Sequence, residues 1–462
     1  MRVPDFHLRL TDLQHRVLKQ HLFPGDGLEA VALVLCGRRE SSENHVLVAR
    51  EILCVPHAEC QRREDGVTWP LSYAEQLLVK QYGKRQALVK VHNHPAIYSQ
   101  FSGQDDISDR KVLAGFSSFC DDGLSHASAV MQPDGSMFGR VLLEKEAVFK
   151  SLRKITVVGD DIVIWPERKR GFVSEFALRQ AQAFGEGTID LLRSLTVGIV
   201  GCSGTGSFVV EQLARLGVHK LVLVDPDRVE EKNLNRIVNA SKEDAYLGRS
   251  KVRVLASAIA RMGLDQEVVP LQANIVSREA VLTLAECDIV FGCMDGVEGR
   301  NLLNRLSTFY LIPYFDVGVK LEADGKGGIK TISGSVHYLQ PGKSSLYSRG
   351  MYDMEQVRAE STRRINPERY EEQRRQGYIR GVAVDRPAVV SVNALFAALL
   401  VNDMLARLHP YRNLSNGEFA TIACNLAEVQ FFNEPENNPC QLLLKYVGAG
   451  DIDPLLDRSS LS

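Results

Sequence analysis

The segment LTVGIVGCSGTGSFVVEQLARLG, residues 195–217, constrains the fold of this chain more than any other. An apolar run typical of a buried strand leads into a glycine loop, and an amphipathic helix pattern follows. Two further apolar runs, at 220–225 and 287–295, predict strands, and a helix pattern begins near Ser250 between them. Strands that alternate with helices in this way predict a doubly wound, mainly parallel α/β sheet.

The glycine loop predicts a phosphate site. Gly201, Gly204 and Gly206 leave room for backbone N–H groups to approach a phosphate at the helix N-terminus. The second strand ends in Asp225, where an acid can hold a ribose hydroxyl. These features also fit a nicotinamide-dependent oxidoreductase, so on their own they predict only nucleotide binding.

The next segment, VDPDRVEEKNLNRIVNASKEDAYLGRSK at residues 224–251, helps to decide which class of nucleotide-binding protein this is. It resembles the ThiF and ubiquitin-activating adenylyltransferase family, in which D-x-D, N-L-x-R and G-x-x-K recur after the second strand. Hydride transfer has no need of these motifs. The residues that carry the resemblance are Asp225, Asp227, Asn233, Arg236, Gly248 and Lys251.

The resemblance implies a role for each polar residue in ATP-dependent adenylation. Asn233 and Arg236 would contact the phosphates near the α position, and Lys251 would contact the β and γ groups. Asp225 would hold the ribose, and Asp295, in FGCMDGVEGR, would bind Mg²⁺. Adenylation needs such groups because attack on the α-phosphate builds negative charge on phosphoryl oxygens.

The entry segment FALRQAQAFGE, residues 176–186, resembles the family's R-x-x-R-Q. It keeps Arg179 and Gln180, and Phe176 stands where the first arginine would be. In the family this arginine reaches the ATP site of a second subunit, so the resemblance implies a homodimer. Ser203 occupies the usual place of the second loop glycine, a change that we expect to be tolerated.

The family's structural zinc is not expected here. Relatives hold it on two C-x-x-C pairs, whereas this chain has Ser345 and Ser348 after QPG, and Cys440 is followed by Leu443. One thiolate cannot assemble a closed tetrahedral site. We therefore expect no structural zinc in the ThiF-like domain.

The acceptor of the activated acyl group stays open. Residues 341–386 contain no cysteine, although family members that transfer the acyl group usually place one there. The reaction stops at the acyl-adenylate, or Ser361, Thr362 or a more remote thiol accepts the acyl group. The remaining thiol candidates, more often packing residues in such positions, are Cys202, Cys293 and Cys424.

The N-terminal part carries a second site in VHNHPAIYSQFSGQDD, residues 91–106. His92 and His94 stand two apart on a predicted strand, so their side chains project from one face. Asp105 can add an oxygen, which completes the three-ligand set of a catalytic zinc with water in the fourth position. The pattern of His92, His94, Ser102 and Asp105 resembles the JAMM (JAB/MPN) metalloprotease family, whose members cleave bonds after ubiquitin-like proteins.

That resemblance also implies a glutamate general base and a hydroxyl donor. GLEAVALVLCG offers Glu29 as the base, with Gly37 eight residues on where seven are expected, and Ser102 would donate to the developing oxyanion. The alternative is that His92 and His94 are surface histidines, or remnants in a domain that only binds.

Length and composition set the organisation. A chain of 462 residues is longer than one hydrophobic core usually serves, and we place a JAMM-like α/β domain at 1–165 and a Rossmann-type ThiF-like domain at 173–450.

The net charge of −2 gives no basic excess for binding nucleic acid. Apolar runs such as 394–401 are short for a membrane span, and nine scattered cysteines suggest reduced thiols in a cytoplasm. The charge-rich segment 351–380 is predicted to be mainly a solvated face.

The two resemblances together imply an enzyme that adenylates the C-terminus of a ubiquitin-like protein with ATP and Mg²⁺ and holds one Zn²⁺ in a JAMM-like peptidase domain. Expected partners are a ubiquitin-like modifier or sulfur-carrier protein, a ubiquitin-conjugating-like carrier enzyme and a second copy of the chain. Three alternatives stay open. The N-terminal domain could be a binding module, or the ThiF-like domain could activate a sulfur carrier for cofactor biosynthesis. A nicotinamide-dependent oxidoreductase rests only on the glycine loop and Asp225.

Overall fold

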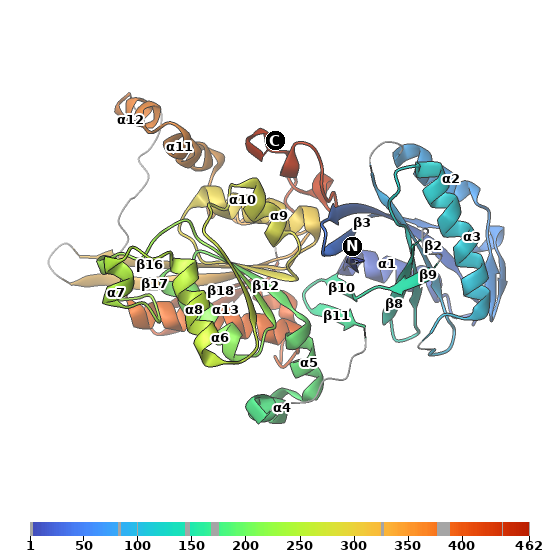
Figure 1. Cartoon of the computed structure of the whole chain (residues 1–462), viewed down its shortest axis with the longest axis horizontal. Coiled ribbons are helices and arrows are strands. Elements are labelled where there is room, and N and C mark those ends of the chain that lie inside the picture. Colours follow the sequence, from blue (N-terminus) through green and yellow to red (C-terminus); the bar gives the residue numbers. More distant parts are fainter. Residues whose placement is uncertain are drawn as a thin grey trace. The chain divides into compact units, whose positions relative to one another are not determined.

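The structure is a computed structural model of a chain that divides into two compact units. Unit 1 holds Met1–Lys169 with two short later segments, Phe309–Leu311 and Tyr446–Asp453. Unit 2 holds the rest of the chain (Figure 1). The structure describes residues 3–81, 85–98, 100–143, 148–167, 175–324, 328–376, 389–436 and 438–461. The domain boundaries at 1–165 and 173–450 stay a prediction.

Unit 1 is built on a nine-stranded mixed sheet of order β11-β10-β1-β3-β2-β6-β7-β8-β9. A small hairpin of β4 and β5 lies apart from it. The strands are β1 (Asp5–Thr11), β2 (Val31–Glu40), β3 (Asn44–Cys54), β4 (Gln61–Arg63), β5 (Gly66–Thr68), β6 (Ala87–Asn93), β7 (Ala127–Met131), β8 (Met137–Leu143), β9 (Val148–Ser151), β10 (Lys154–Val158) and β11 (Ile162–Pro166). The helices are α1 (Asp12–Leu22), α2 (Ser72–Gln81) and α3 (Gly103–Cys120).

Alternation along β2 shows why this sheet is covered on both faces. Ala32 and Val34 join an apolar cluster that contains residues of α1. Leu33 and Leu35 join a second cluster, with residues of α2 and α3. Successive side chains of a strand point to opposite faces, so a continuous apolar run predicts a strand buried on both sides.

Unit 2 has an eight-stranded sheet of order β14-β13-β12-β15-β16-β17-β18-β19. The first five strands in this order are parallel, and the last three extend the sheet antiparallel. The strands are β12 (Thr196–Val200), β13 (Lys220–Val224), β14 (Glu267–Leu271), β15 (Ile289–Gly292), β16 (Tyr314–Ala323), β17 (Ile329–Leu339), β18 (Thr421–Asn425) and β19 (Gln430–Glu434). The predicted doubly wound α/β sheet is confirmed.

Helices cover both faces of this sheet, with α6 and α8 on one side and α9 and α10 on the other (Figure 1). The helix predicted to open after the glycine loop is α6, and the one predicted near Ser250 is α8. The helices of unit 2 are α4 (Leu178–Phe184), α5 (Glu186–Ser194), α6 (Gly204–Arg215), α7 (Lys242–Tyr246), α8 (Lys251–Met262), α9 (Arg278–Leu284), α10 (Val297–Tyr310), α11 (Met354–Ile365), α12 (Pro367–Arg375) and α13 (Val390–Leu408).

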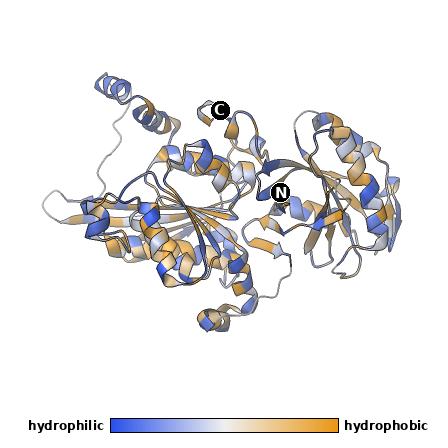
Figure 2. Cartoon of the chain, in the orientation of Figure 1, coloured by the Kyte–Doolittle hydropathy of each residue, from blue (hydrophilic) through white to orange (hydrophobic). Residues whose placement is uncertain are grey.

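The charge-rich segment after residue 351 is more than a solvated face. It forms α11 and α12, whose hydrophilic colouring in Figure 2 agrees with its composition. Val357, Ala359 and Tyr370 are nevertheless buried. The prediction is corrected for these residues because a few apolar side chains suffice to anchor a polar helix pair. Residues 377–380 of the predicted segment lie outside the described residues.

The apolar run at 394–401 belongs to α13, which is longer than the run itself. Among the described residues, α13 is the one helix long and apolar enough to cross a membrane by length and composition. The expectation that this region is too short is therefore corrected. In the structure 61% of its apolar window is buried, and the helix packs against α6 and β16.

Candidate active sites

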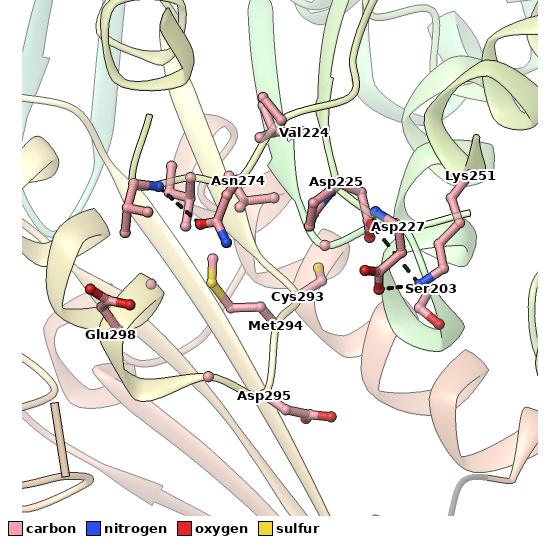
Figure 3. A pocket seen from close by; sticks show the side chains of 18 of the residues that line it. Ser203, Val224, Asp225, Asp227, Lys251, Asn274, Cys293, Met294, Asp295 and Glu298 are labelled. Atoms are coloured by element: carbon pink, nitrogen blue, oxygen red, sulfur yellow. Dashed lines mark hydrogen bonds and ion pairs between the residues drawn. The ribbon is translucent and has the colours of Figure 1, made fainter. Parts of the chain in front are cut away.

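The first candidate site lies at the carboxyl ends of β12, β13 and β15 in unit 2. Its cavity of about 480 Å³ is lined by residues from all three strand ends and from the start of α8 (Figure 3). Open α/β sheets bind ligands at this edge, where the strand order reverses. The cavity gathers most of the residues predicted from the sequence: Gly201, Asp225, Asp227, Asn233, Arg236, Lys251 and Asp295.

The glycine loop is closely packed under this cavity. Gly201 has a φ of +89°, which favours glycine, and a side-chain carbon at Gly206 would overlap the Gly201 carbonyl oxygen. A side-chain carbon at Gly204 would overlap the amide of Asn393. Ser203 lines the cavity with a negative φ of −99°, so no backbone strain opposes a side chain there.

Asp225 is buried and organises the loop. One carboxylate oxygen accepts from the Cys202 N–H at 2.7 Å, and the other accepts from the Asp227 N–H at 2.9 Å. Burial raises the pKa of Asp225, and the nearby Lys251 ammonium acts in the opposite direction. Asp225 therefore fixes the loop that faces the cavity.

Lys251 begins α8 and is buried at the cavity wall. Its Nζ lies 2.7 Å from Asp227 Oδ2 and 3.8 Å from Asp225 Oδ1. Two carboxylates thus hold the ammonium in place. An entering phosphate would replace part of this pairing.

Asn233 and Arg236 line the same cavity from the turn before α7. Asn233 is buried, and its Oδ1 accepts from the Glu230 N–H at 3.1 Å. The Arg236 guanidinium donates to the Lys232 carbonyl at 2.9 Å and to Asn235 Oδ1 at 3.1 Å. Within the described part of the chain Arg236 pairs with no carboxylate, so its charge is available to an anion.

Asp295 and Arg179 have different positions. Asp295 follows β15 on the cavity wall, apart from the group of Asp225, Asp227 and Lys251 (Figure 3). Arg179 is exposed on α4 and does not line this cavity. Its expected role in the site of a second subunit stays a prediction.

Sequence reasoning missed three acidic residues of the cavity, Glu230, Glu298 and Glu360. Glu360 of α11 accepts from the Glu298 N–H at 2.8 Å, at the start of α10. Glu298 in turn pairs with Arg364 at 2.8 Å. No motif predicts these contacts. Val357 and Glu360 are three residues apart, so they lie on one face of α11. An apolar residue on that face is the local sign that it packs against another element.

The thiols considered as acyl acceptors are buried or have raised pKa values. Cys202 and Cys424 are buried, and Cys293 lines the cavity. Burial raises the pKa of Cys202 and of Cys293 well above the usual range, which disfavours the thiolate. Ser361 and Thr362 are half-buried on α11. All nine cysteines are free.

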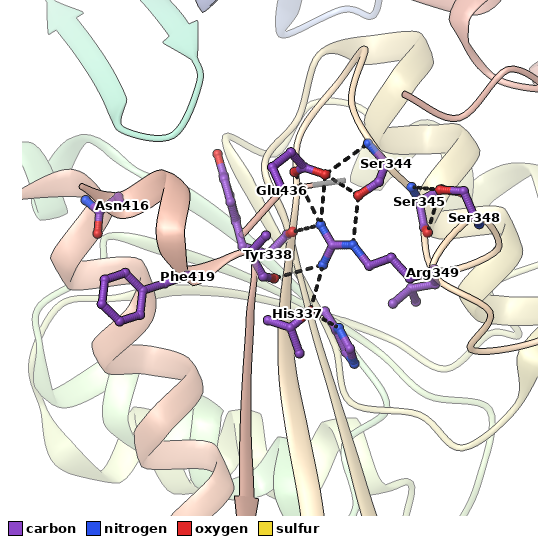
Figure 4. A network of polar contacts seen from close by, with 12 residues as sticks. His337, Tyr338, Ser344, Ser345, Ser348, Arg349, Asn416, Phe419 and Glu436 are labelled. Atoms are coloured by element: carbon purple, nitrogen blue, oxygen red, sulfur yellow. Dashed lines mark hydrogen bonds and ion pairs between the residues drawn. The ribbon is translucent and has the colours of Figure 1, made fainter. Parts of the chain in front are cut away.

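A polar network occupies the place where the family's cysteine pairs would stand. Ser345 N–H donates to Ser348 Oγ at 2.9 Å, and Ser348 N–H donates to Ser345 Oγ at 3.2 Å (Figure 4). The Cys440 N–H donates to the Lys343 carbonyl at 3.0 Å, which brings the two distant segments together. The prediction of no zinc here is not tested by the structure.

The second candidate site lies in unit 1, where β6 meets α3. His92 Nε2 lies 2.9 Å from Asp105 Oδ1, and His94 Nε2 lies 3.3 Å from Asp105 Oδ2. The three possible ligand atoms lie within 4.8 Å of one another, and all three residues are buried. Both Nδ1 atoms are buried without a hydrogen-bond partner among the described residues. Two imidazoles and a carboxylate that converge in this way fit the donor set of a catalytic zinc.

Electrostatics also favour an ionised carboxylate in this cluster. Burial opposes the charged form of Asp105, but hydrogen bonds from His92 and His94 lower its pKa well below the usual range. Burial lowers the pKa of His92, so its imidazole is neutral. A neutral imidazole and an ionised carboxylate are the protonation states that bind a metal ion.

Glu29 lies beside this cluster because of strand register. The antiparallel pairing of β2 with β6 places Val31 opposite His92, so Glu29, two residues earlier, comes opposite His94. Its side chain lines a cavity of about 480 Å³ together with His92 and Asp105. Burial raises the pKa of Glu29 to about 7.

Ser102 caps α3 next to the cluster. Its Oγ donates to Asp105 Oδ2 at 2.7 Å and accepts from the Asp105 N–H at 3.1 Å, which forms the N-terminal cap of α3. Ser102 therefore orients a candidate metal ligand. Its expected donation to an oxyanion stays a prediction.

Comparison with known proteins finds relatives of unit 2. A sequence model described as the ThiF family matches residues 177–442. Ubiquitin-like modifier-activating enzyme 5 of Caenorhabditis elegans is 29% identical over 168 residues, which cover 34% of this chain and 38% of that protein. The same enzyme of Bombyx mori is also 29% identical, over 34% and 40% of the two chains. The chain thus spans less than half the length of these relatives.

Two solved structures of E. coli MccB are similar at a lower level. The complex with MccA-N7isoASN is 18% identical, with a TM-score of 0.46 over 59% of this chain and 75% of that one. The structure with ATP is 20% identical, with a TM-score of 0.44 over 60% and 75%.

Proposed function

Because the chain belongs to the ThiF family, we propose that unit 2 uses ATP and Mg²⁺ to adenylate the C-terminal carboxylate of a ubiquitin-like protein. One observation supports this most directly. The residues of three separate sequence motifs, after β13, before α8 and after β15, line a single cavity. Chance surface charges would not meet at one sheet edge.

The chain's residues fit the charges of the reaction. A carboxylate oxygen attacks the α-phosphorus, the bond to the bridging oxygen breaks, and pyrophosphate leaves with an acyl-adenylate formed. Arg236 and Lys251 would offset the negative charge that builds on the phosphates. Asp295 and Asp227 would hold Mg²⁺, which neutralises phosphate oxygens when bound.

ATP–pyrophosphate exchange tests this proposal. Exchange is measured with candidate ubiquitin-like proteins, and with the same proteins lacking their last residues as negative controls. Lys251→Ala should lower the rate by a factor on the order of 100 or more, as for loss of one charge-stabilising group. Lys330→Ala, which changes an exposed lysine near the start of β17, is the matched control. Equal rates for Lys251→Ala and wild type would refute the assignment.

Arg179 and the homodimer are tested by mixing variants. If Arg179 completes the cavity of a second subunit, Arg179→Ala and Lys251→Ala are each inactive alone. Mixed dimers would regain one intact cavity, and exchange activity would return. Failure to recover activity in a preparation shown to be dimeric by sedimentation would remove this role.

For unit 1 we propose a zinc-dependent peptidase that processes or deconjugates the same modifier. The convergence of His92, His94 and Asp105 beside Glu29 supports it. Zinc, when bound, lowers the pKa of water and polarises a carbonyl. Glu29 would accept and return the proton, and Ser102 would keep Asp105 oriented.

Metal content and cleavage test this second function separately. Wild-type protein should hold about one zinc per chain, and His94→Ala should hold none. His219→Ala, an exposed histidine of unit 2, is the control. Glu29→Gln should keep zinc and lose cleavage of a modifier fusion. Zinc-free wild type, purified without chelator and with added zinc, would make unit 1 a binding module.

A sulfur-carrier substrate is the alternative for unit 2. It predicts that the acyl-adenylate is converted by sulfide to a thiocarboxylate, which mass spectrometry detects. The oxidoreductase alternative predicts NAD binding. Binding of ATP but not of NAD in a calorimetric titration would remove that alternative.

A further inference from the structure

A second cavity of unit 2, of about 700 Å³, is used by neither proposed reaction. It lies along α8 and the turns before it, and we call it the arginine groove. Its charged and polar walls include Arg228, Asp244, Arg249, Ser250, Arg253 and Arg261.

A narrow ribbon separates the arginine groove from the nucleotide cavity. Arg228 and Ser250 form an antiparallel bridge, flanked by backbone hydrogen bonds from Val229 N–H to the Arg249 carbonyl and from Lys251 N–H to the Asp227 carbonyl. Side chains alternate across extended backbone. Asp227 and Lys251 therefore face the nucleotide cavity, while Arg228 and Ser250 face the arginine groove.

The groove has more positive charge than its own acids neutralise. Arg249 pairs with Glu243 and Asp244, both at 2.9 Å. Arg253 and Arg261 are exposed and pair with no carboxylate in the described ranges. Arg228 donates to the Gly248 carbonyl at 2.7 Å and likewise pairs with no carboxylate among the described residues, so three guanidinium groups remain for an external anion.

Ser250 is an independent sign that the groove has an occupant. It stands at the N-cap position of α8, where serine normally accepts from the first helical turn, yet it makes no such bond. Its Oγ is buried without a hydrogen-bond partner among the described residues. Unpartnered buried hydroxyls are uncommon, and a ligand in the groove would supply the partner.

The spacing of the arginines sets the size of the ligand. Arg253 and Arg261 are eight residues apart on one helix, or about 12 Å at 1.5 Å per residue. A single phosphate is too small to reach both. In an extended peptide, carboxylates four residues apart lie on one side and about 13 Å apart.

We propose that the arginine groove binds an extended acidic segment of a partner polypeptide, with Arg253 and Arg261 each pairing with one carboxylate. The exposed Tyr246 and Leu247 offer apolar contact beside the charges. Because neighbouring residues of the ribbon line the groove and the nucleotide cavity, the bound segment would hold its partner close to the adenylation site.

Fluorescence anisotropy tests the proposal on the full chain. The probe is a labelled peptide of alternating Glu and Ser residues, and its Gln-for-Glu counterpart is the negative control. The Glu peptide should bind wild type, more weakly as salt rises. Arg253→Glu with Arg261→Glu should weaken binding roughly tenfold or more. Lys330→Glu should leave it unchanged.

The outcomes separate the alternatives. ATP affinity is measured on every variant, and the milder Arg253→Gln is used if the double variant loses ATP binding. Equal affinity of the double variant and wild type, or equal affinity for the Glu and Gln peptides, would overturn the proposal. Binding of inorganic phosphate but not of the Glu peptide would identify a small-anion site instead.

Discussion

Replacing Arg349 should destabilise unit 2 by several kcal/mol. This arginine follows β17 and donates to the carbonyls of Tyr338 and Ala420 and to Ser344 Oγ, each at 2.8 Å (Figure 4). It also pairs with Glu436 at 3.3 Å. Arg349 thereby ties together the segments after β17, before β18 and after β19.

The magnitude follows from burial. The side chains of Arg349 and Glu436 are 6% and 12% exposed, so water compensates little if one is removed. Arg349→Met leaves the Glu436 carboxylate without its countercharge and removes one donor each from the Tyr338 and Ala420 carbonyls, of which Ala420 still accepts from the Tyr338 N–H. Breaking a buried pair in this way costs about 3–5 kcal/mol.

The assay uses the distribution of tryptophan. Both tryptophans, Trp69 and Trp165, belong to unit 1, so their fluorescence reports that unit alone. Thermal unfolding of Arg349→Met followed by far-UV circular dichroism should show an early transition that the fluorescence does not. For 3–5 kcal/mol the expected shift is roughly 6–20 °C. Chelator should not shift the wild-type transition of unit 2.

A double variant separates the ion pair from simple loss of packing. Glu436→Gln removes the carboxylate that Arg349→Met leaves unpaired. The free energy of unfolding should therefore fall clearly less when Glu436→Gln is added to Arg349→Met than when it is made in wild type. Lys320→Met, which breaks an exposed pair with Glu322, is the control and should stay within about 0.5 kcal/mol. Additive costs of the two buried substitutions would refute the coupling.

Three further predictions concern the glycine loop, the capping serines and acid stability. Gly206→Ala should abolish ATP binding in a calorimetric titration because the new carbon overlaps backbone, whereas Gly187→Ala, with open space around it, should not. Ser102→Ala and Ser241→Ala should each cost about 1 kcal/mol in urea unfolding, since both remove a helix cap, but only Ser102→Ala should weaken zinc binding. Burial lowers the pKa of His126 from 6.5 to about 3, so the unfolded state binds more protons and stability falls below pH 6.5. The loss reaches about 4–5 kcal/mol near pH 3. His126→Asn should flatten this dependence in urea unfolding followed by tryptophan fluorescence.

The architecture of unit 2 could be predicted because its signals are local. Each strand and helix around the glycine loop has its own periodicity, and parallel strands bring their carboxyl ends to one edge. This arrangement of strands and helices brings Asp225, Lys251 and Asp295 to one cavity. The prediction required no knowledge of contacts between residues that are far apart in the sequence.

Contacts between distant segments could not be predicted. Glu360 reaches the start of α10 only because α11 packs there, and its surroundings in the sequence are charged. In unit 1, a side-chain carbon at Gly37 would overlap the carbonyl of Ala449, far away in sequence. The sequence does not distinguish a glycine that is required by a close contact with a distant segment from a glycine that is not.

The zinc motif shows why half of a local pattern can mislead. Its S-x-x-D part is also the pattern of a capping box, and the chain contains a second one. Ser241 and Asp244 repeat the bonds of Ser102 and Asp105 almost distance for distance, with no histidine nearby in sequence. The serine and aspartate therefore carry little information about metal binding.

What distinguishes the two boxes is strand register. At Asp105 the cap faces the side of β6 that carries His92, and β2 brings Glu29 opposite His94. At Asp244 the same carboxylate pairs with Arg249 at 2.9 Å. A metal site predicted from such a motif therefore depends on evidence that a neighbouring strand supplies the remaining residues. Moving the β2–β6 register by one residue would turn Glu29 to the opposite face and leave an ordinary helix cap.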